Sequence, residues 1–264
     1  MSVPGPSSRK VYYFDGTANL GVNLTGTDGQ VGAFDPPGTE ITLQNLEGSA
    51  SINPVVVPTG HTQSPDLTLP IWADSTLQEL IDDIHGVTPA DRNDQRILAT
   101  IWTGGDVIGQ RVDIGLAYLL SVKPKTPQAQ LTQLETVWRY TKACFPHAHI
   151  VHALTARTAD GNSQASSIDN SAASTAGGIG FFGYTTYTAD GATGLAVRVV
   201  DSADNATFAA LVTFTTVTAT TGGGSYGELS TTATVRRYVA ADWDFTGSPG
   251  AGTTATFFVA FKRF

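Results

Sequence analysis

The second half of the chain alternates apolar with polar or small residues. In residues 195–200, for example, leucine and valine side chains take every other position, which places them on one face of a pleated strand. Comparable runs occupy residues 179–188, 208–217, 226–229, 235–243 and 254–264. Turn signals separate them at Asp190-Gly191, Asp204-Asn205, Gly222-Gly223-Gly224 and Gly247-Ser248-Pro249-Gly250. Short strands with turns at this spacing predict a β-sandwich or barrel.

The first half also consists mostly of strand-like pieces. They cover residues 11–14, 20–24, 40–46, 52–57, 67–71, 96–102, 110–122, 130–141 and 149–156. Glycine and proline interrupt the earlier pieces, so we expect loops at 26–38 and 58–65 and a mobile arm at the N-terminus.

One segment, residues 76–85, has the periodicity of a helix. Its apolar stripe follows the i, i+3, i+4, i+7 rule and consists of Leu77, Leu80, Ile81 and Ile84. Ser75 is a good N-cap, and Gln78 completes a capping box. Gly86 supplies a stop. We expect this helix to lie with its stripe on a sheet.

Residues 158–178 differ in composition from both halves. They are nearly all small or polar, and Ile168 is the only large apolar residue among them. This predicts a domain boundary near Asp160-Gly161, with a short edge strand around 166–169. The expected fold class is mainly β: a β-sandwich or barrel with one helix in residues 1–157, followed by a self-contained all-β sandwich in residues 158–264.

Composition and charge narrow the function classes. A chain of 264 residues that is 41% hydrophobic can bury the core of one large domain or two ordinary ones. The net charge of −8 argues against binding to nucleic-acid backbone, which needs clustered Lys and Arg. The single cysteine, Cys144, excludes an internal disulfide framework. We see no signal peptide and no apolar run long enough to span a membrane, so we expect a soluble protein made in a reducing cytosol.

Two glycine-rich motifs overlap in residues 222–227. Residues 223–227 match G-x-S-x-G around Ser225, but a nucleophile elbow needs a strand-to-helix turn and a histidine, and no histidine follows His152. Gly222, Gly224 and Gly227 match G-x-G-x-x-G, which needs a following helix to hold a phosphate. We expect a hairpin turn here and neither chemistry.

Three histidines and the cysteine form the next candidate. In a strand, His147 and His149 would share a face and could bind a metal, whereas His152 would point away. Pro146 precedes them and no carboxylate lies close in sequence, so structural or surface histidines are favoured. Cys144 could be a nucleophile, but a lone cysteine is more often a small buried hydrophobe.

Two further features could bind ligands. The run Asp201-Ser202-Ala203-Asp204-Asn205 offers oxygen ligands, but it lacks the spacing and terminal Glu of a calcium loop, which favours an acidic turn. The aromatic residues Phe181, Phe182, Tyr184 and Tyr187 could stack on a sugar, although we expect two on each face of the strand and at least one pair in the core. We assign no catalytic residue, no metal ligand and no cofactor, and we predict that the chain is not an enzyme.

Several segments resemble a known family. They are residues 195–214 (LAVRVVDSADNATFAALVTF), 234–239 (TVRRYV) and 254–261 (TATFFVAF). These resemble the outer β-sandwich appended to the major tail, or tail tube, protein of long-tailed, non-contractile (siphovirus-type) bacteriophages. Residues 109–115, 121–125 and 134–138 look like the late strands of the tube domain. Residues 18–70 have no counterpart in this resemblance.

The resemblance implies a structural virion protein. Such proteins form hexameric rings that stack into a tube around a tape-measure protein, meet head–tail connector and tail-tip proteins, and conduct DNA to the host without binding it specifically. It implies a tube-like β domain in residues 1–157, with the helix 76–85 packed outside, and a surface sandwich in residues 158–264. Assembly would take place in the host cytoplasm, away from any membrane.

Two rival functions stay open beside the tail tube. One is a capsid decoration or host-surface protein whose sandwich binds glycans, and the other is a hydrolase that uses Ser225. If the tube assignment holds, the negative charge gains a role, because a wall of carboxylates would repel DNA phosphates and let the genome slide.

Overall fold

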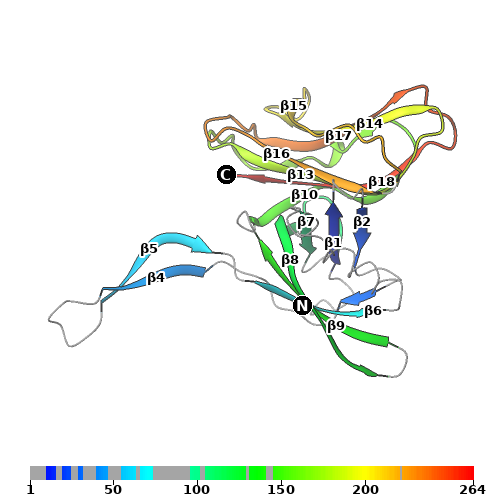
Figure 1. Ribbon diagram of the computed structural model, residues 1–264. Coiled ribbons are helices and arrows are strands. Elements are labelled where there is room, and N and C mark those ends of the chain that lie inside the picture. Colours follow the sequence, from blue (N-terminus) through cyan, green and yellow to red (C-terminus); the bar gives the residue numbers. More distant parts are fainter. Residues whose placement is uncertain are drawn as a thin grey trace, which may run out of the picture.

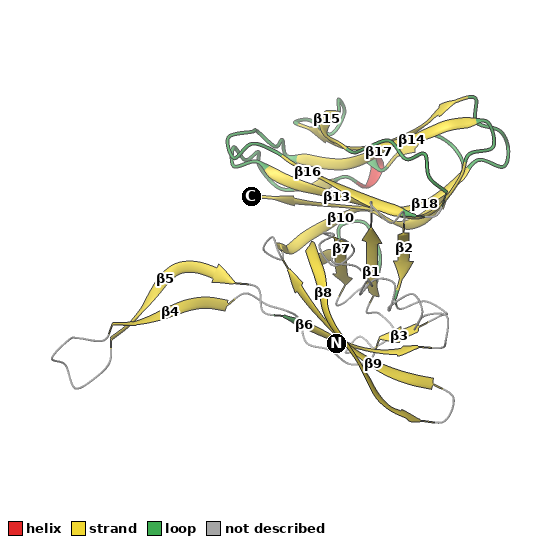
Figure 2. Ribbon diagram, viewed as in Figure 1, coloured by secondary structure: helices red, strands yellow, loops and turns green. Residues whose placement is uncertain are grey.

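The computed structural model describes residues 10–15, 20–24, 29–31, 40–46, 55–63, 66–73, 96–101, 105–128, 131–140, 145–220 and 222–264. Nearly all the regular structure in these residues is strand, so the predicted mainly-β fold class is confirmed (Figure 2). The predicted helix at 76–85 lies outside the described residues, as do Cys144 and most of the N-terminal arm.

Among the described residues, eleven strands form one antiparallel sheet. Its main path runs β16–β13–β18–β10–β8–β7–β1–β2, and β3, β6 and β9 branch from β8 (Figure 1). The bounds are β1 Lys10–Asp15, β2 Leu20–Asn23, β3 Gly29–Val31, β6 Leu67–Ala73, β7 Arg96–Ile101, β8 Arg111–Gln128, β9 Leu131–Tyr140, β10 Phe145–Arg157, β13 Gly178–Thr188, β16 Gly223–Glu228 and β18 Thr254–Arg263.

A second described sheet has five strands and lies over β13 and β18. It comprises β11 Gly161–Asn162, β12 Ile168–Asp169, β14 Ala192–Ser202, β15 Ala209–Thr213 and β17 Tyr238–Gly247, and a short 3₁₀ helix spans Gln164–Ser166. The strand β12 falls within the edge strand predicted at 166–169. Two further strands, β4 Glu40–Leu46 and β5 Val55–Gln63, form a hairpin that projects away from the body (Figure 1).

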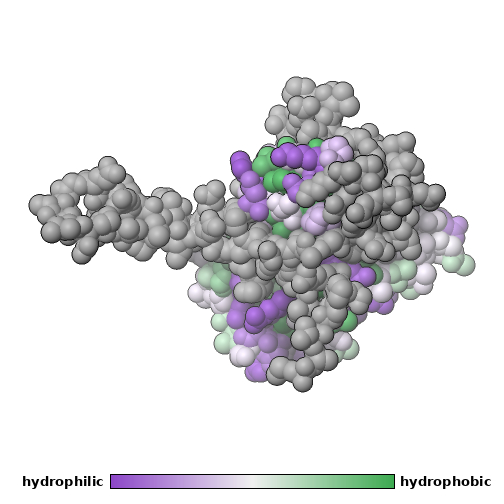
Figure 3. Space-filling model, turned by 90° about the horizontal axis from the view of Figure 1, so that it is seen from below, coloured by the Kyte–Doolittle hydropathy of each residue, from purple (hydrophilic) through white to green (hydrophobic). Residues whose placement is uncertain are grey.

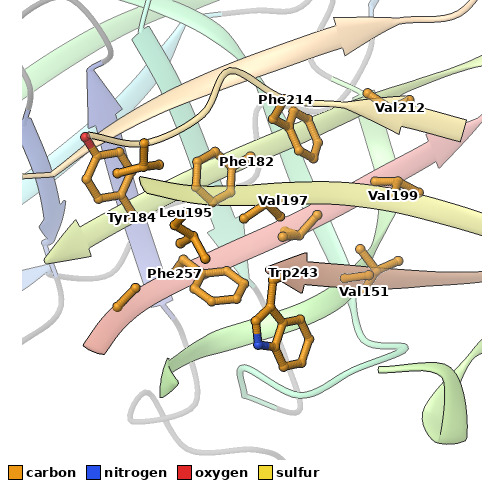
Figure 4. Packing of buried hydrophobic residues seen from close by; sticks show 14 of the residues in the cluster. Val151, Phe182, Tyr184, Leu195, Val197, Val199, Val212, Phe214, Trp243 and Phe257 are labelled. Atoms are coloured by element: carbon orange, nitrogen blue, oxygen red, sulfur yellow. The ribbon is translucent and has the colours of Figure 1, made fainter. Parts of the chain in front are cut away.

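The two sheets enclose a core of aromatic and β-branched side chains (Figure 4). Phe182 stands at its centre, with ring centroids 5.5 Å from Phe214 and 6.1 Å from Phe257. Val197 and Trp243 close the core from the second sheet. Fully burying a side chain of this size stabilises a fold by roughly 1.5–3 kcal/mol, so this cluster supplies a large share of the driving force.

The strands β13 and β18 are buried on their other face as well. Phe257 and Phe261 point into the sandwich, whereas Phe258 and Ala260 belong to a second cluster that also holds Phe181 of β13. That second cluster is completed by residues of β1, β7, β8 and β10, namely Tyr12, Phe14, Ile97, Ala99, Ile101, Val112, Ile114, Leu116, Ala148 and Ile150. The part of the eleven-stranded sheet that contains β13 and β18 is therefore the middle layer of three.

The first strands cross the middle layer at a steep angle (Figure 1). Phe14 of β1 contacts two glycines there. A Cβ atom added to Gly183 would lie 2.2 Å from the ring of Phe14, and a Cβ atom added to Gly224 would lie 2.9 Å from the Cβ of Phe14. Gly21 of β2 comes equally close, since its Cβ would lie 1.9 Å from the carbonyl oxygen of Tyr184. Only glycine allows this approach of two backbones.

A third cluster fills the far side of β1 and β7 together with β6, β8 and β9. Trp138 is fully buried in it, with its ring centroid 5.6 Å from that of Tyr13. The indole N–H donates to the hydroxyl of Thr136, which in turn donates to the carbonyl of Leu69. The polar end of the tryptophan is thus satisfied inside an apolar cluster, as burial requires.

The loops predicted at 26–38 and 58–65 are partly wrong, because β3 and most of β5 lie within them. Pro58 is tolerated in β5, where it pairs with Leu43 next to a register shift in a hairpin of only two strands. A proline is acceptable at such an edge because the ladder loses a donor without leaving a central strand unpaired.

Strand β10 joins the two predicted domains. It pairs with β8 through Ala148 and Val112, and with β18 through Ile150 and Ala260. The boundary residue Ser163 links the layers, since its hydroxyl donates to the carbonyl of Val151 and accepts from the N–H of Ala241. Independent folding of residues 158–264 stays a prediction, and this geometry shows how to test it.

We expect the fragment 163–264 to be markedly less stable than the intact chain. It lacks β10, so one edge of β18 is unpaired, and it exposes Ile179, Phe181 and Phe258, each worth roughly 1.5–3 kcal/mol when buried. Thermal unfolding and binding of a hydrophobic dye compare it with a fragment 145–264, which restores β10. Equal unfolding temperatures for the fragment 163–264 and the whole chain would show that the sandwich is self-contained.

We expect Gly183→Ala to destabilise the chain by about 1–3 kcal/mol, because the new methyl group meets the ring of Phe14. Phe14→Leu removes that ring, so the double variant should lose less stability than the sum of the two single variants. Urea unfolding of the four proteins gives this coupling. Strictly additive losses would mean that the ring does not press on this glycine.

Candidate functional site

The glycine-rich motif at Ser225 forms a strand. Residues Gly223–Glu228 are β16, and Ser225 pairs with Phe182 of β13, so the hairpin turn predicted at these residues is wrong. The positive φ of Gly222, 105°, bends the chain just before the strand. The later glycines serve close packing instead, since a Cβ on Gly227 would lie 2.6 Å from a methyl carbon of Val212. The Ser225 hydroxyl is buried and has no hydrogen-bond partner in the described structure.

The predicted aromatic platform is buried on both faces. Phe181, Phe182, Tyr184 and Tyr187 are all at most 5% exposed. The predicted split of two on each face is wrong, because a register shift after Tyr184 brings Tyr187 to the sandwich side with Phe182 and Tyr184. Phe181 alone faces the other cluster. These rings are core residues and offer no surface on which a sugar could stack.

The predicted acidic turn at 201–205 is present. Oδ1 of Asp204 accepts hydrogen bonds from the N–H groups of Ala206 and Thr207, which lower its pKa to about 2. Oδ2 of Asp201 accepts from the N–H of Arg236. The carboxylates thus fix the loop. Within the described residues, no group of three or more His, Cys, Asp or Glu side chains could hold a metal ion.

The histidines of β10 do not form one site. The side chain of His147 lies outside the described residues, while His149 is half-buried and pairs in register with Arg111. His152 is fully buried, with its ring stacked on Phe257 at 4.2 Å between centroids and edge-on to Trp243 at 4.8 Å.

The hydrogen bonds of His152 fix its tautomer. Nδ1 lies 3.2 Å from the carbonyl oxygen of Phe257 and therefore carries the proton, and Nε2 accepts a bond of 2.9 Å from Nε of Arg157. The Arg157 guanidinium also lies 5.0 Å from the ring centre of Trp243. Burial lowers the pKa of His152 to about 3, and the Arg157 cation acts in the same direction. The contacts of His152 with Phe257, Arg157 and Trp243 connect the two sheets and hold its imidazole in the neutral form.

No sequence pattern singles out the carboxylates of Asp15 and Asp106, which the structure places inside the molecule, because an isolated Asp belongs to no motif. Asp15 forms an ion pair with Arg96 of 2.9 Å, and both side chains are almost wholly buried. Asp106 accepts from the Tyr12 hydroxyl at 2.8 Å and from the N–H of Leu154 at 2.7 Å, while its other oxygen has no partner in the described structure. Burial raises the pKa of Asp106, and the two hydrogen bonds oppose that shift. Both groups tie β1 to its neighbours.

One edge of β8 has no partner among the described strands along the second half of the strand. Ala117 of β8 pairs with Arg96 of β7 on one side and with Tyr140 of β9 on the other. Beyond it, residues 118–128 pair with β9 alone among the described strands, and Leu120 is 41% exposed. Farther along β8, Lys123 and Pro124 disfavour pairing with a further strand. The stretch of β8 that is open to pairing is therefore short.

The underside of the molecule carries hydrophilic and hydrophobic described residues at short intervals (Figure 3). None of the helices in the described structure has the length and apolar character needed to cross a membrane.

Comparison with known proteins gives few matches. No family model matches the chain, and no curated protein matches it. One solved chain from the phage p2 baseplate in its activated conformation with Sr aligns at 11% identity and a TM-score of 0.41, covering 97% of this chain and 98% of that one. A chain from the same baseplate with Ca aligns at 12% identity and a TM-score of 0.40, with the same coverage. These TM-scores are too low to establish a shared fold.

We expect stability to fall as the pH drops from about 6.5 toward 3, because the unfolded chain protonates His152 while the folded chain keeps it neutral. At pH 5 the loss from this group is about 2 kcal/mol. Urea unfolding against pH should show a shallower slope for His152→Gln than for the wild type. A slope unchanged in His152→Gln would contradict a buried neutral imidazole.

Proposed function

We propose that this chain is a structural protein of a bacteriophage virion, a tail tube subunit that assembles into hexameric rings. The rings stack into a tube around a tape-measure protein, between a head–tail connector and the tail-tip proteins, and the tube conducts DNA to the host. The resemblance of residues 195–214, 234–239 and 254–261 to the outer sandwich of such proteins supports this. So does the layered β architecture, in which that sandwich stands on one side of the first strands (Figure 1).

The observation that carries the proposal is the open edge of β8. Among the described strands, residues 118–128 of β8 have a partner on one edge only, and this edge with its exposed Leu120 offers backbone donors and acceptors to a neighbouring strand. In a ring, each copy presents the same edge to the next copy. The strand edge that would promote aggregation of a monomer then forms the contact between neighbouring subunits.

The hairpin of β4 and β5 supports stacking. Among the described strands these two pair only with each other, and they project from the body (Figure 1). A two-stranded hairpin is only marginally stable by itself in water. Contact with a neighbouring ring would supply the missing partner.

The negative charge fits passage of DNA. A lumen lined with carboxylates repels phosphates, whereas a basic lumen would bind DNA through counterion release. This role rests on the net charge of −8. A map of assembled tubes with a lumen lined mainly by Lys and Arg would contradict it.

We expect purified full-length protein to form rings or tubes in negative-stain microscopy, and Leu120→Asp to remain folded but monomeric. A charge at this exposed position disfavours edge pairing without entering the core. The control Thr231→Asp, in an exposed turn, should assemble like the wild type. Circular dichroism checks the folds and light scattering measures the masses.

Three results would count against the proposal. A wild type that stays monomeric at all concentrations contradicts self-assembly, and a Leu120→Asp variant that still forms rings contradicts the role of this edge. Soluble trimers that bind saccharide would favour the decoration or adhesion function instead.

A further inference from the structure

A recess opens at one end of the sandwich, where the two sheets diverge. It has a volume of about 130 Å³, and β10 and β18 line it from one sheet while β12 and β17 line it from the other. Its apolar floor consists of Val151, Ile168, Val239 and Phe261, and its polar rim of His149, Asn170, Lys262 and Arg263. No motif pointed to this recess, because its residues come from distant parts of the sequence.

Basic residues without an ion-pair partner in the described structure lie close together at the rim of the recess. Five described arginines form ion pairs with aspartates: Arg96, Arg139, Arg198, Arg236 and Arg237. Lys262 and Arg263 of the rim, and Arg111 beside Lys262, form no ion pair in the described part of the chain. The whole chain has a net charge of −8, so neighbouring basic side chains without an ion-pair partner among the described residues indicate a site that attracts an anion.

Arg263 is held rigidly at the rim. Its guanidinium donates to the carbonyl groups of Ala172 and Asn170, which fix its position but leave its positive charge unbalanced. The turn that carries Asn170 is itself anchored, because the Asn170 side-chain amide donates to the carbonyl of Arg237. The cation is therefore preorganised.

Lys262 is half-buried beside a like charge. Burial lowers the pKa of its ammonium group, Arg111 acts in the same direction, and Asp113 opposes them. His149 pairs in register with Arg111 and so adds a further donor next to this group. An anion in the recess would relieve the repulsion between Lys262 and Arg111.

We propose that this recess binds an oxyanion, the carboxylate or phosphate group of a ligand. Ammonium, guanidinium and imidazole groups donate charge-assisted hydrogen bonds to such a group, and a volume of about 130 Å³ accommodates it with a few attached carbon atoms on the apolar floor. The site does not depend on the assembly proposed above, because all its residues belong to one copy of the chain.

The test uses full-length protein with sodium phosphate or sodium glutarate as the probe, at an ionic strength held constant with sodium chloride. Both thermal unfolding and calorimetric titration report binding. The variants are Lys262→Gln, Arg111→Gln and their combination, and Lys123→Gln is the control, since it removes an exposed lysine on the distal half of β8.

Phosphate or glutarate should raise the unfolding temperature of the wild type and of Lys123→Gln above the value in chloride. Each single variant at the recess should weaken binding about tenfold, and the double variant should respond as in chloride alone. A stronger response to phosphate assigns the site to phosphate-bearing ligands, and a stronger response to glutarate assigns it to carboxylates.

The proposal is overturned if the wild type responds to both probes no more than to chloride, or if the double variant responds like the wild type. Without probe, Lys262→Gln should unfold at the same or a higher temperature, because it removes the repulsion with Arg111. If Lys262→Gln nevertheless fails to fold, the binding measurements with Arg111→Gln decide, because the exposed position of Arg111 tolerates the substitution.

Discussion

The contact between Phe14 and the bare backbone of Gly183 and Gly224 sets the spacing between the first strands and the middle layer. Because no Cβ intervenes, β1 and β2 can lie directly on β13 and β16, and the apolar faces of these two parts of the eleven-stranded sheet pack against each other. The central residues of β13 and β18 are then buried on both faces. The sandwich and the first strands therefore share one sheet. The pairing of β18 with β10, and of β10 with β8, fixes the position of the sandwich relative to the first strands.

Polar groups inside this layered structure are placed where strands must be held in register. The Asp15–Arg96 pair joins β1 to β7, Asp106 joins the start of β1 to β10, and Ser163 joins the two sheets. A buried ion pair adds little net stability, but loss of one partner leaves an uncompensated charge, so such pairs penalise any alternative register. The neutral His152 acts in the same way at the junction between the layers.

Function is proposed for surfaces that this core leaves unsatisfied. Beyond Ala117, one edge of β8 has no partner among the described strands, and Lys262 and Arg263 at the rim of the recess form no ion pair in the described residues. The first needs a long, repeated contact with another strand, whereas the second needs one small anionic group. Both could be occupied at once in an assembled particle, because they lie on different parts of the chain.

The sequence by itself determined the mainly-β class and the positions of most strands, because period two is a local property that each strand carries. It also determined the acidic turn at Asp204, where the side chain bonds its own neighbours. Only the tertiary structure decided that the strand predicted at 226–229 begins as early as Gly223 and that all four aromatic residues of β13 are buried. The unbroken apolar run of residues 257–261 was the signal for burial on both faces, but one of these faces is covered largely by residues more than a hundred positions away. The recess likewise arises from side chains that meet only after the sheets have packed, which no local pattern encodes.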